Sequence, residues 1–101
     1  MANMFDNLKQ VGQMKKQAAQ FEKLLRTKTV EAVSQRGEVR VKINGKMELL
    51  EIDISADALV PEKKDYLERV IKNTMAKAQS EVEKIISSEV KAQMGSLKMP
   101  F

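Results

Sequence analysis

Two rows of lysines repeat at intervals of seven residues in this sequence. Seven residues make nearly two turns of an α-helix, so the members of each row share one helical face. An ammonium group is a point charge that suits sequence-independent contact with phosphates. The spacing therefore indicates two cationic stripes that would contact a nucleic-acid backbone if both segments are helical. The rows are Lys9, Lys16 and Lys23 near the N-terminus, and Lys77, Lys84, Lys91 and Lys98 near the C-terminus.

The first row differs from an ordinary solvated helix face because it lacks acids. Between Asp6 and Arg26 the one acid is Glu22, which falls close to the apolar side of the helical wheel. Exposed faces usually mix Glu and Lys four residues apart, because each such pair stabilises a helix by about 0.2–0.5 kcal/mol. The missing pairs favour phosphate contact, with a plain solvated face as the alternative. Lys15 and Arg26 share one flank of the apolar stripe, and glutamines fill much of the polar face: Gln10, Gln13, Gln17 and Gln20.

The second row gives weaker support, because Glu81 and Glu83 interleave with its lysines. Ordinary pairing along the helix explains part of this pattern. The chain has one tyrosine, three phenylalanines and no tryptophan, which argues against platforms that stack single-stranded bases. The two rows together predict backbone contact, with little support for strong base readout.

Residue types that carry catalysis are scarce. The chain has no histidine and no cysteine, which removes the commonest general base, thiolate metal sites and disulfides. It also has no glycine-rich phosphate loop. Asp53 and Asp57 flank a turn and are the best pair for a divalent cation, but acids that cap a loop are the simpler interpretation. We therefore expect neither an enzyme nor a cofactor or metal.

Length and composition bound the remaining possibilities. A chain of 101 residues with 43% hydrophobic residues makes one domain with a thin core, for which self-association is a common remedy. The net charge of +4 mildly favours a polyanionic partner. The sequence contains no run of about 18 apolar residues, so no membrane span is predicted. The N-terminus lacks a secretion-signal pattern. We expect a cytoplasmic protein.

Helices are needed to position the two lysine rows, and the hydrophobic pattern predicts a helix for each row. Apolar residues three or four apart predict a helix over residues 4–26. Period-two alternation then predicts strands over residues 29–34, 38–43 and 46–54, with Asn44-Gly45 indicating a type I′ hairpin turn. A change of alternation at Leu49-Leu50 predicts a β-bulge. A second helix is expected over residues 61–94, before a short tail. The fold class is α+β: a helix, a three-stranded antiparallel meander and a long helix.

The second helix is too long for a compact domain. Its roughly 34 residues span about 50 Å at 1.5 Å per residue. A compact chain of this size has a radius of gyration of about 13 Å. The helix should therefore project, and its distal apolar residues then need a partner, which a second copy of the chain would supply.

The chain resembles the YbaB/EbfC family of bacterial nucleoid-associated proteins. The resemblance covers nearly the whole chain and rests on NLKQVGQMKKQAAQFEKLL, GEVRVKINGKMELLEIDISADAL, KKDYLERVIKNTMAKAQSEVEK and the closing MPF. It implies a tweezer-like homodimer whose projecting helices bind double-stranded DNA with low or modest sequence preference, in nucleoid organisation and gene regulation. The DNA-binding residues expected on these helices are Lys9, Lys15, Lys16, Lys23, Arg26, Lys84 and Lys91.

A protein-interaction module is the alternative function. A helix, a hairpin and a helix also suit a prefoldin-like chaperone subunit or a coiled-coil adaptor. A prefoldin subunit would have two long helices of comparable length, whereas roughly 22 and 34 residues are expected here. The unequal lengths and the acid-free lysine face favour DNA.

Overall fold

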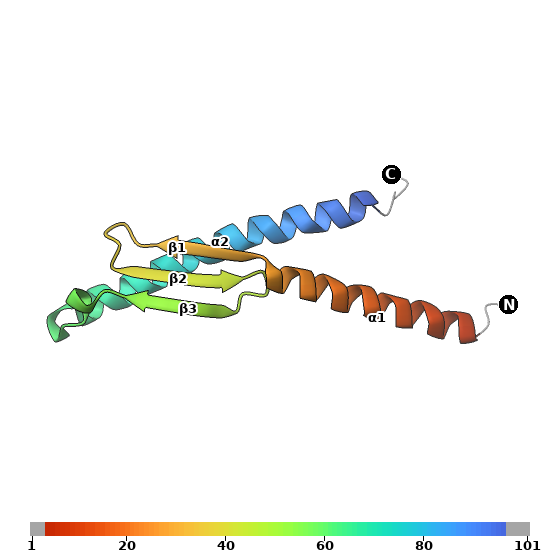
Figure 1. Cartoon of the computed structure of the whole chain (residues 1–101), viewed down its shortest axis with the longest axis horizontal. Coiled ribbons are helices and arrows are strands. Elements are labelled where there is room, and N and C mark those ends of the chain that lie inside the picture. The colour runs from red at the N-terminus through yellow and green to blue at the C-terminus, as the bar shows by residue number, and fades with distance from the viewer. Residues whose placement is uncertain (1–3, 97–101) are drawn as a thin grey trace.

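The chain forms a helix, a three-stranded antiparallel sheet and a second, longer helix, which confirms the predicted fold class. The computed structural model describes residues 4–96, and the side chains of residues 8–94. It is elongated, with extents of 71 × 26 × 19 Å, because both helices run beyond the same end of the sheet (Figure 1). The elements are α1 (Met4–Thr27), β1 (Thr29–Val33), β2 (Val39–Asn44), β3 (Leu49–Ile54), the 3₁₀ turns η1 (Ala56–Ala58) and η2 (Pro61–Lys63), and α2 (Lys64–Ser96).

The core lies between the sheet and the first part of α2. The strands are ordered β1-β2-β3, and the alternation of β2 places Val39, Val41 and Ile43 on the face that α2 covers. All three side chains are fully buried. Ala78 and Val82 of α2 pack against them, since small and branched residues let the helix approach the sheet closely.

The long C-terminal helix begins later than the sequence pattern indicates. Residues 61–63 form η2, and the α-helix itself starts at Lys64. Pro61 at the first position of η2 has its φ fixed near the helical value and lacks the N–H that a helix start leaves unpaired. The proline therefore initiates the helical segment as expected, with one 3₁₀ turn before the α-helix.

The loop between β2 and β3 differs from the prediction. A type I′ turn needs φ > 0 at its central residues, but the left-handed residue here is Met47, with φ 62°. The Met47 N–H donates to the carbonyl of Asn44 at 3.0 Å, so residues 44–47 form a turn whose last residue is the left-handed one. The type I′ prediction is wrong, because the backbone N–H of Gly45 is engaged in a contact with the end of α1.

That contact joins Gly45 to the end of α1. The Gly45 N–H donates to the carbonyl oxygens of Leu25 and Lys28, each at 2.9 Å. A Cβ at position 45 would lie 2.5 Å from the Leu25 oxygen, so only glycine fits. The glycine is needed for close approach to the helix terminus, where carbonyl groups lack partners within the helix.

The Asn44 side chain organises the rest of this loop. Its Oδ1 accepts hydrogen bonds from the N–H groups of Lys46 and Glu48, at 2.9 and 3.1 Å. Its Nδ2 donates to Oε1 of Glu48 at 2.9 Å, and this bond lowers the pKa of the Glu48 carboxyl group. Because residues 46–48 are held in the loop, β3 begins at Leu49 and not at residue 46 as predicted.

The predicted bulge in β3 is confirmed. Lys42 pairs with Glu51 while Ile43 pairs with Leu49, so Leu50 is the extra residue. Leu49, Leu50 and Ile52 are each about half exposed, since α2 lies along β1 and β2 and does not cover β3 (Figure 1). The sheet thus ends in an uncovered apolar strand.

Candidate nucleic-acid interface

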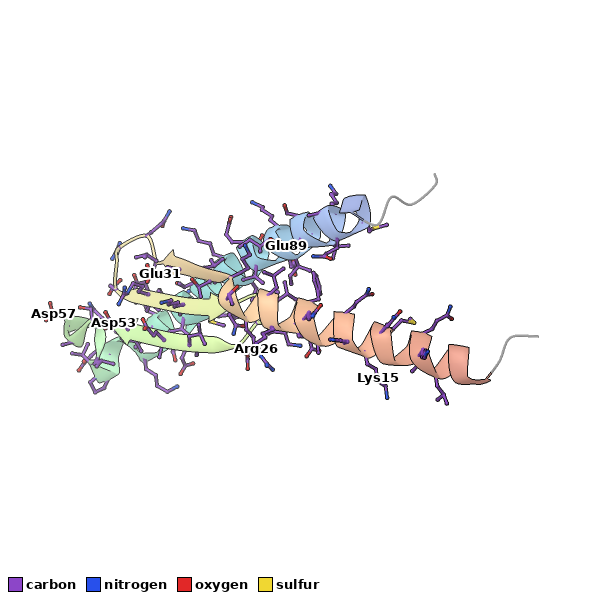
Figure 2. All side chains as sticks on the ribbon, turned by 45° about the vertical axis from the view of Figure 1, so that its right-hand side comes forward. Lys15, Arg26, Glu31, Asp53, Asp57 and Glu89 are labelled. Atoms are coloured by element: carbon purple, nitrogen blue, oxygen red, sulfur yellow. The ribbon has the colours of Figure 1, made fainter. Side chains whose placement is uncertain are left out.

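The lysine face of α1 is exposed and carries no compensating acid. Lys9, Lys15, Lys16 and Lys23 are all exposed, and none forms an ion pair with a side chain that the structure describes. The helix extends away from the sheet, so most of its length is not covered by the rest of the chain (Figure 1). Figure 2 shows Lys15 on the projecting part of α1, whereas Asp53 and Asp57 lie at the opposite end of the molecule.

The one acid of α1 between residues 8 and 27 is engaged by a cation. Glu22 Oε1 lies 3.2 Å from Nζ of Lys46, at the end of the helix that meets the sheet. Lys9, Lys16 and Lys23 rise about 10.5 Å per step along the axis and drift by only about 20°. Positive charge therefore dominates the projecting surface of α1 between residues 8 and 23.

Arg26 differs from the other predicted contacts on α1. Its Nε lies 3.5 Å from Oε1 of Glu48, in the loop before β3. Both side chains are about half exposed, so this pair contributes little stability. Arg26 belongs to the junction of helix and sheet, and its charge is less available than that of Lys23.

The row on α2 is partly compensated. Lys84 Nζ lies 3.2 Å from Oε1 of Glu81, as the interleaved acids indicated. Lys77 and Lys91 are exposed and form no ion pair with a described side chain. Glu89 is drawn to the other side of the helix, 3.4 Å from Nζ of Lys28. Lys91 is therefore the freer of the two predicted α2 contacts, and Lys98 lies outside the described residues.

The apolar stripe of α1 is uncovered in the protomer. Leu8, Val11 and Met14 are 64%, 49% and 67% exposed. They lie roughly opposite the row of Lys9, Lys16 and Lys23, whereas Lys15 is on the flank of the stripe. Only the last turns of α1 approach the sheet, where Leu25 is buried. The stripe predicted as a packing seam thus has no packing partner within the described protomer.

Asp53 and Asp57, for which capping of a loop was the simpler interpretation, lie on β3 and in η1. Asp53 Oδ2 lies 3.8 Å from Nη2 of Arg40, and Asp57 belongs to η1. Among the described residues, no group of three or more potential metal ligands is close enough to hold an ion. Asp53 acts instead as a partner of Arg40, which also meets Glu31 at 3.3 Å.

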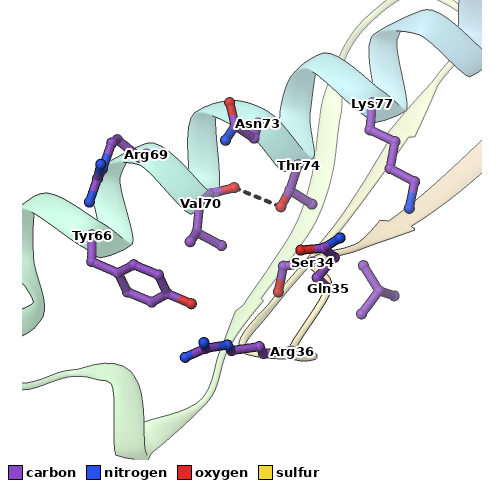
Figure 3. Close-up of a pocket in the computed structure, with 10 residues that line it drawn as sticks. Ser34, Gln35, Arg36, Tyr66, Arg69, Val70, Asn73, Thr74 and Lys77 are labelled. Carbon is purple, nitrogen blue, oxygen red and sulfur yellow. Dashed lines mark hydrogen bonds between the residues drawn. The ribbon is translucent and has the colours of Figure 1, made fainter.

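Sequence reasoning missed a further group of cations. Arg36 follows β1, while Arg69 and Lys77 lie on α2, and all three line a cavity of about 490 Å³ (Figure 3). Arg36 and Arg69 have no common spacing in the sequence, so only the packing of α2 on the sheet brings them to one place. Lys77 was identified only as a member of the α2 row.

The family follows from comparison with known proteins. A model described as the YbaB/EbfC DNA-binding family matches residues 1–97. The chain belongs to this family. The YbaB/EbfC assignment agrees with what the residues of α1 indicate, and this family is described by DNA binding and not by a catalytic activity.

Relatives and a solved structure support the YbaB/EbfC assignment. A nucleoid-associated protein of Pelotomaculum thermopropionicum is 33% identical over 98 residues, covering 97% of this chain and 93% of the relative. One of Alkaliphilus metalliredigens is 31% identical, covering 97% and 86%. An uncharacterized protein of Helicobacter pylori shares the fold, with a TM-score of 0.73 at 20% identity over 93% of this chain and 99% of the other. Within the described part of this YbaB/EbfC chain, neither helix has the length of apolar sequence that a membrane span requires.

Proposed function

We propose that this chain acts as a non-enzymatic homodimer that contacts duplex DNA through the lysine-bearing faces of its projecting helices. The contacts are made with low or modest sequence preference, and the protein works in the cytoplasm on nucleoid organisation and gene regulation. The observation that carries the proposal is the exposed, acid-free lysine face of α1. Membership of a DNA-binding family indicates that the polyanion is DNA.

The ammonium groups and the glutamine amides act on phosphates. Each phosphate that a lysine neutralises releases condensed counterions, and this release drives sequence-independent binding. Lys9, Lys15, Lys16 and Lys23 are the main contacts because no described acid competes for them. Lys91 adds to them from α2. Lys84 and Arg26 contribute less, since each must first leave a carboxylate that lies within 3.5 Å.

Self-association follows from the apolar surfaces that one protomer leaves uncovered. β3 is an edge strand with unpaired backbone groups, and Leu49, Leu50 and Ile52 are about half exposed on it. An uncovered apolar edge strand is a ready site for pairing with another chain. A dimer formed there doubles the number of lysine-bearing helices that one DNA molecule meets.

A prefoldin-like chaperone or coiled-coil adaptor is the second candidate. The exposed stripe of Leu8, Val11 and Met14 on a projecting helix favours it, since clients bind such surfaces. The unequal helices, 24 residues in α1 and 33 in α2, and the family assignment favour DNA. Binding of random duplex DNA at low and at moderate salt separates the two functions. Duplex binding that weakens steeply with salt supports the proposal, and absence of binding at low salt supports the chaperone.

A further inference from the structure

A cleft lies between the segment that joins β1 to β2 and the first half of α2. It has a volume of about 490 Å³, and Figure 3 shows the residues that line it. Its charged lining residues are Arg36, Arg69 and Lys77, and no acid is among the residues that line it. The volume falls in the range of about 300–1,000 Å³ that small-molecule sites occupy. The cleft therefore has the size and the charge of an anion site.

The three cations have no carboxylate partners within the described part of the chain. Three acids of the sheet and of α2 are engaged elsewhere: Glu31 and Asp53 with Arg40, and Glu68 with Lys64. Glu38 Oε1 accepts the hydrogen bond of the Tyr66 hydroxyl at 2.6 Å, and the side chain of Arg36 also interacts with this hydroxyl. The other carboxylate oxygen of Glu38 lies 3.8 Å from Nζ of Lys63, so this acid is divided between Lys63 and the Tyr66 wall of the cleft.

The lining residues fit a phosphate group in particular. A guanidinium presents N–H groups in a fork that matches two phosphate oxygens, and both Arg36 and Arg69 supply one. Gln35 and Asn73 also line the cleft, and their amide side chains add neutral hydrogen-bond donors. The hydroxyl of Thr74 is taken, because it donates to the carbonyl of Val70 at 2.7 Å.

One wall of the cleft is apolar. In Figure 3 the Tyr66 ring extends from α2 toward the connection between the strands, with Val70 one turn further along the helix. A ring and an aliphatic side chain suit the carbon atoms of a sugar or a base attached to the phosphate. Lys77 also begins the row that continues with Lys84 and Lys91 along the same side of α2.

We propose that this cleft binds a phosphate group, carried by a nucleotide-sized molecule or by a DNA strand. Arg36 and Arg69 hold its oxygens, and Lys77 neutralises its remaining charge. The site is separate from the α1 lysine face. Binding of a free phosphate compound does not depend on the proposed function, whereas binding of a DNA phosphate rests on it and extends the contact from the helices onto the body.

Tyr66 makes the first arm of the test direct. It is the one tyrosine of a chain without tryptophan, so the intrinsic fluorescence reports from the wall of the cleft. The full chain is titrated with ribose 5-phosphate and inorganic pyrophosphate at constant ionic strength, with ribose as a blank. A saturable change is expected for the phosphates alone. The double variant Arg36→Gln/Arg69→Gln should weaken it at least tenfold.

Two further variants control for folding and for charge. Lys72→Gln removes an exposed cation of α2 that does not line the cleft, and should leave the titration unchanged. Arg36→Lys/Arg69→Lys keeps the charge but loses the forks, so it should recover only part of the affinity. Circular dichroism of each variant checks that the helices are retained.

A second arm identifies the source of the phosphate. Labelled duplex DNA is titrated with wild-type protein and with the glutamine double variant at several salt concentrations. A log–log salt slope that is shallower by about two in the variant assigns the cleft to DNA phosphates. An unchanged slope with a lost fluorescence response assigns it to a free phosphate compound.

The proposal is overturned if no phosphate compound gives a saturable response and the double variant binds duplex like the wild type. If the wild type binds no duplex but shows a saturable fluorescence change with ribose 5-phosphate, the proposed function fails and the cleft site stands.

Discussion

The backbone N–H of Gly45 donates to the carbonyl oxygen of Leu25 at 2.9 Å, and this bond ties the end of α1 to the loop between β2 and β3. Leu25 is itself buried, at 7% exposure, whereas the helix before it leaves the protein surface. The direction in which α1 projects therefore depends on a junction of a few residues. Any change there should alter the presentation of the lysine face.

Substitution of Gly45 by alanine should disturb this junction. The added Cβ would meet the Leu25 oxygen at 2.5 Å, so the loop or the helix end must shift. We expect a loss of about 2 kcal/mol in the free energy of unfolding, as for other substitutions that strain a backbone contact. Urea denaturation followed by circular dichroism measures it.

Gly12 provides the matched control. It lies within α1, and a Cβ there would have no heavy atom within 4 Å. Because glycine costs about 0.8–1 kcal/mol relative to alanine in a helix interior, Gly12→Ala should raise helix content without loss of stability. Equal stability of Gly45→Ala and the wild type would show that the Leu25 contact does not hold the helix.

The dimer is tested by a charge placed on β3. Ile52 is 46% exposed on the uncovered strand, and a lysine there would have to be buried in the proposed interface. We expect Ile52→Lys to sediment as a monomer at micromolar concentration, where the wild type sediments as a dimer. Its affinity for duplex DNA should fall as well, since each monomer offers half the phosphate contacts.

Glu51→Lys is the control for this change. Glu51 is the adjacent exposed residue, and successive residues of a strand face opposite sides of the sheet. The variant should still sediment as a dimer. Dimers of both variants would place the interface elsewhere, with the exposed stripe of α1 as the next surface to test. A wild-type monomer at this concentration would contradict the proposed dimer itself.

Tyr66 should titrate above its ordinary range. Its hydrogen bond to Glu38, aided by burial and by the negative charge of that residue, raises the pKa of the Tyr66 hydroxyl above 10.0, and the cation of Arg36 only partly offsets this rise. Absorbance of tyrosinate at alkaline pH follows this single group. Glu38→Gln removes the charge, so the midpoint should fall toward 10.0. The raised pKa contributes stability below pH 10, and this contribution is lost as the pH rises through the midpoint. A midpoint unaffected by Glu38→Gln would contradict the assigned cause.

Local patterns were sufficient for much of this fold. The alternation of Val39, Val41 and Ile43 predicted the buried face of β2, and the change at Leu49-Leu50 predicted the bulge, because both depend on period-two geometry. The turn type was not predictable from Asn44-Gly45, since the Gly45 N–H binds the carbonyl of Leu25, twenty residues away in sequence. Contacts of that kind leave no local signal.

The candidate interface divides in the same way. The lysines of α1 were predictable because one helix alone sets their spacing. The pairing of Arg26 with Glu48 was not, because it requires the β2–β3 loop to fold against the helix end. The cleft cations Arg36 and Arg69 were missed for the same reason, since the packing of α2 on the sheet brings them together.

Reversing the lysine face of α1 should abolish DNA binding. We expect the variant Lys9→Glu/Lys16→Glu/Lys23→Glu to lose affinity for random duplex DNA by several orders of magnitude, because phosphates then meet like charges. Helix content and dimerisation should be retained, since these side chains are exposed. Fluorescence anisotropy of labelled duplex measures the affinity.

The control makes the same charge change on the body of the protein. Lys42, Lys64 and Lys72 lie on the sheet and the first half of α2, away from the projecting part of α1. Their change to glutamate should weaken binding far less. If both triple variants lose affinity equally, net charge and not the α1 face governs binding.

The salt dependence of wild-type binding to random duplex DNA tests the central claim most directly. Four free lysines on each α1 give about eight phosphate contacts per dimer, which corresponds to a log–log slope of about −7. Between about 50 and 200 mM salt the affinity should therefore fall by three or more orders of magnitude. Absence of binding at about 50 mM salt, or an affinity that does not change over this range, would contradict a lysine-driven contact with DNA.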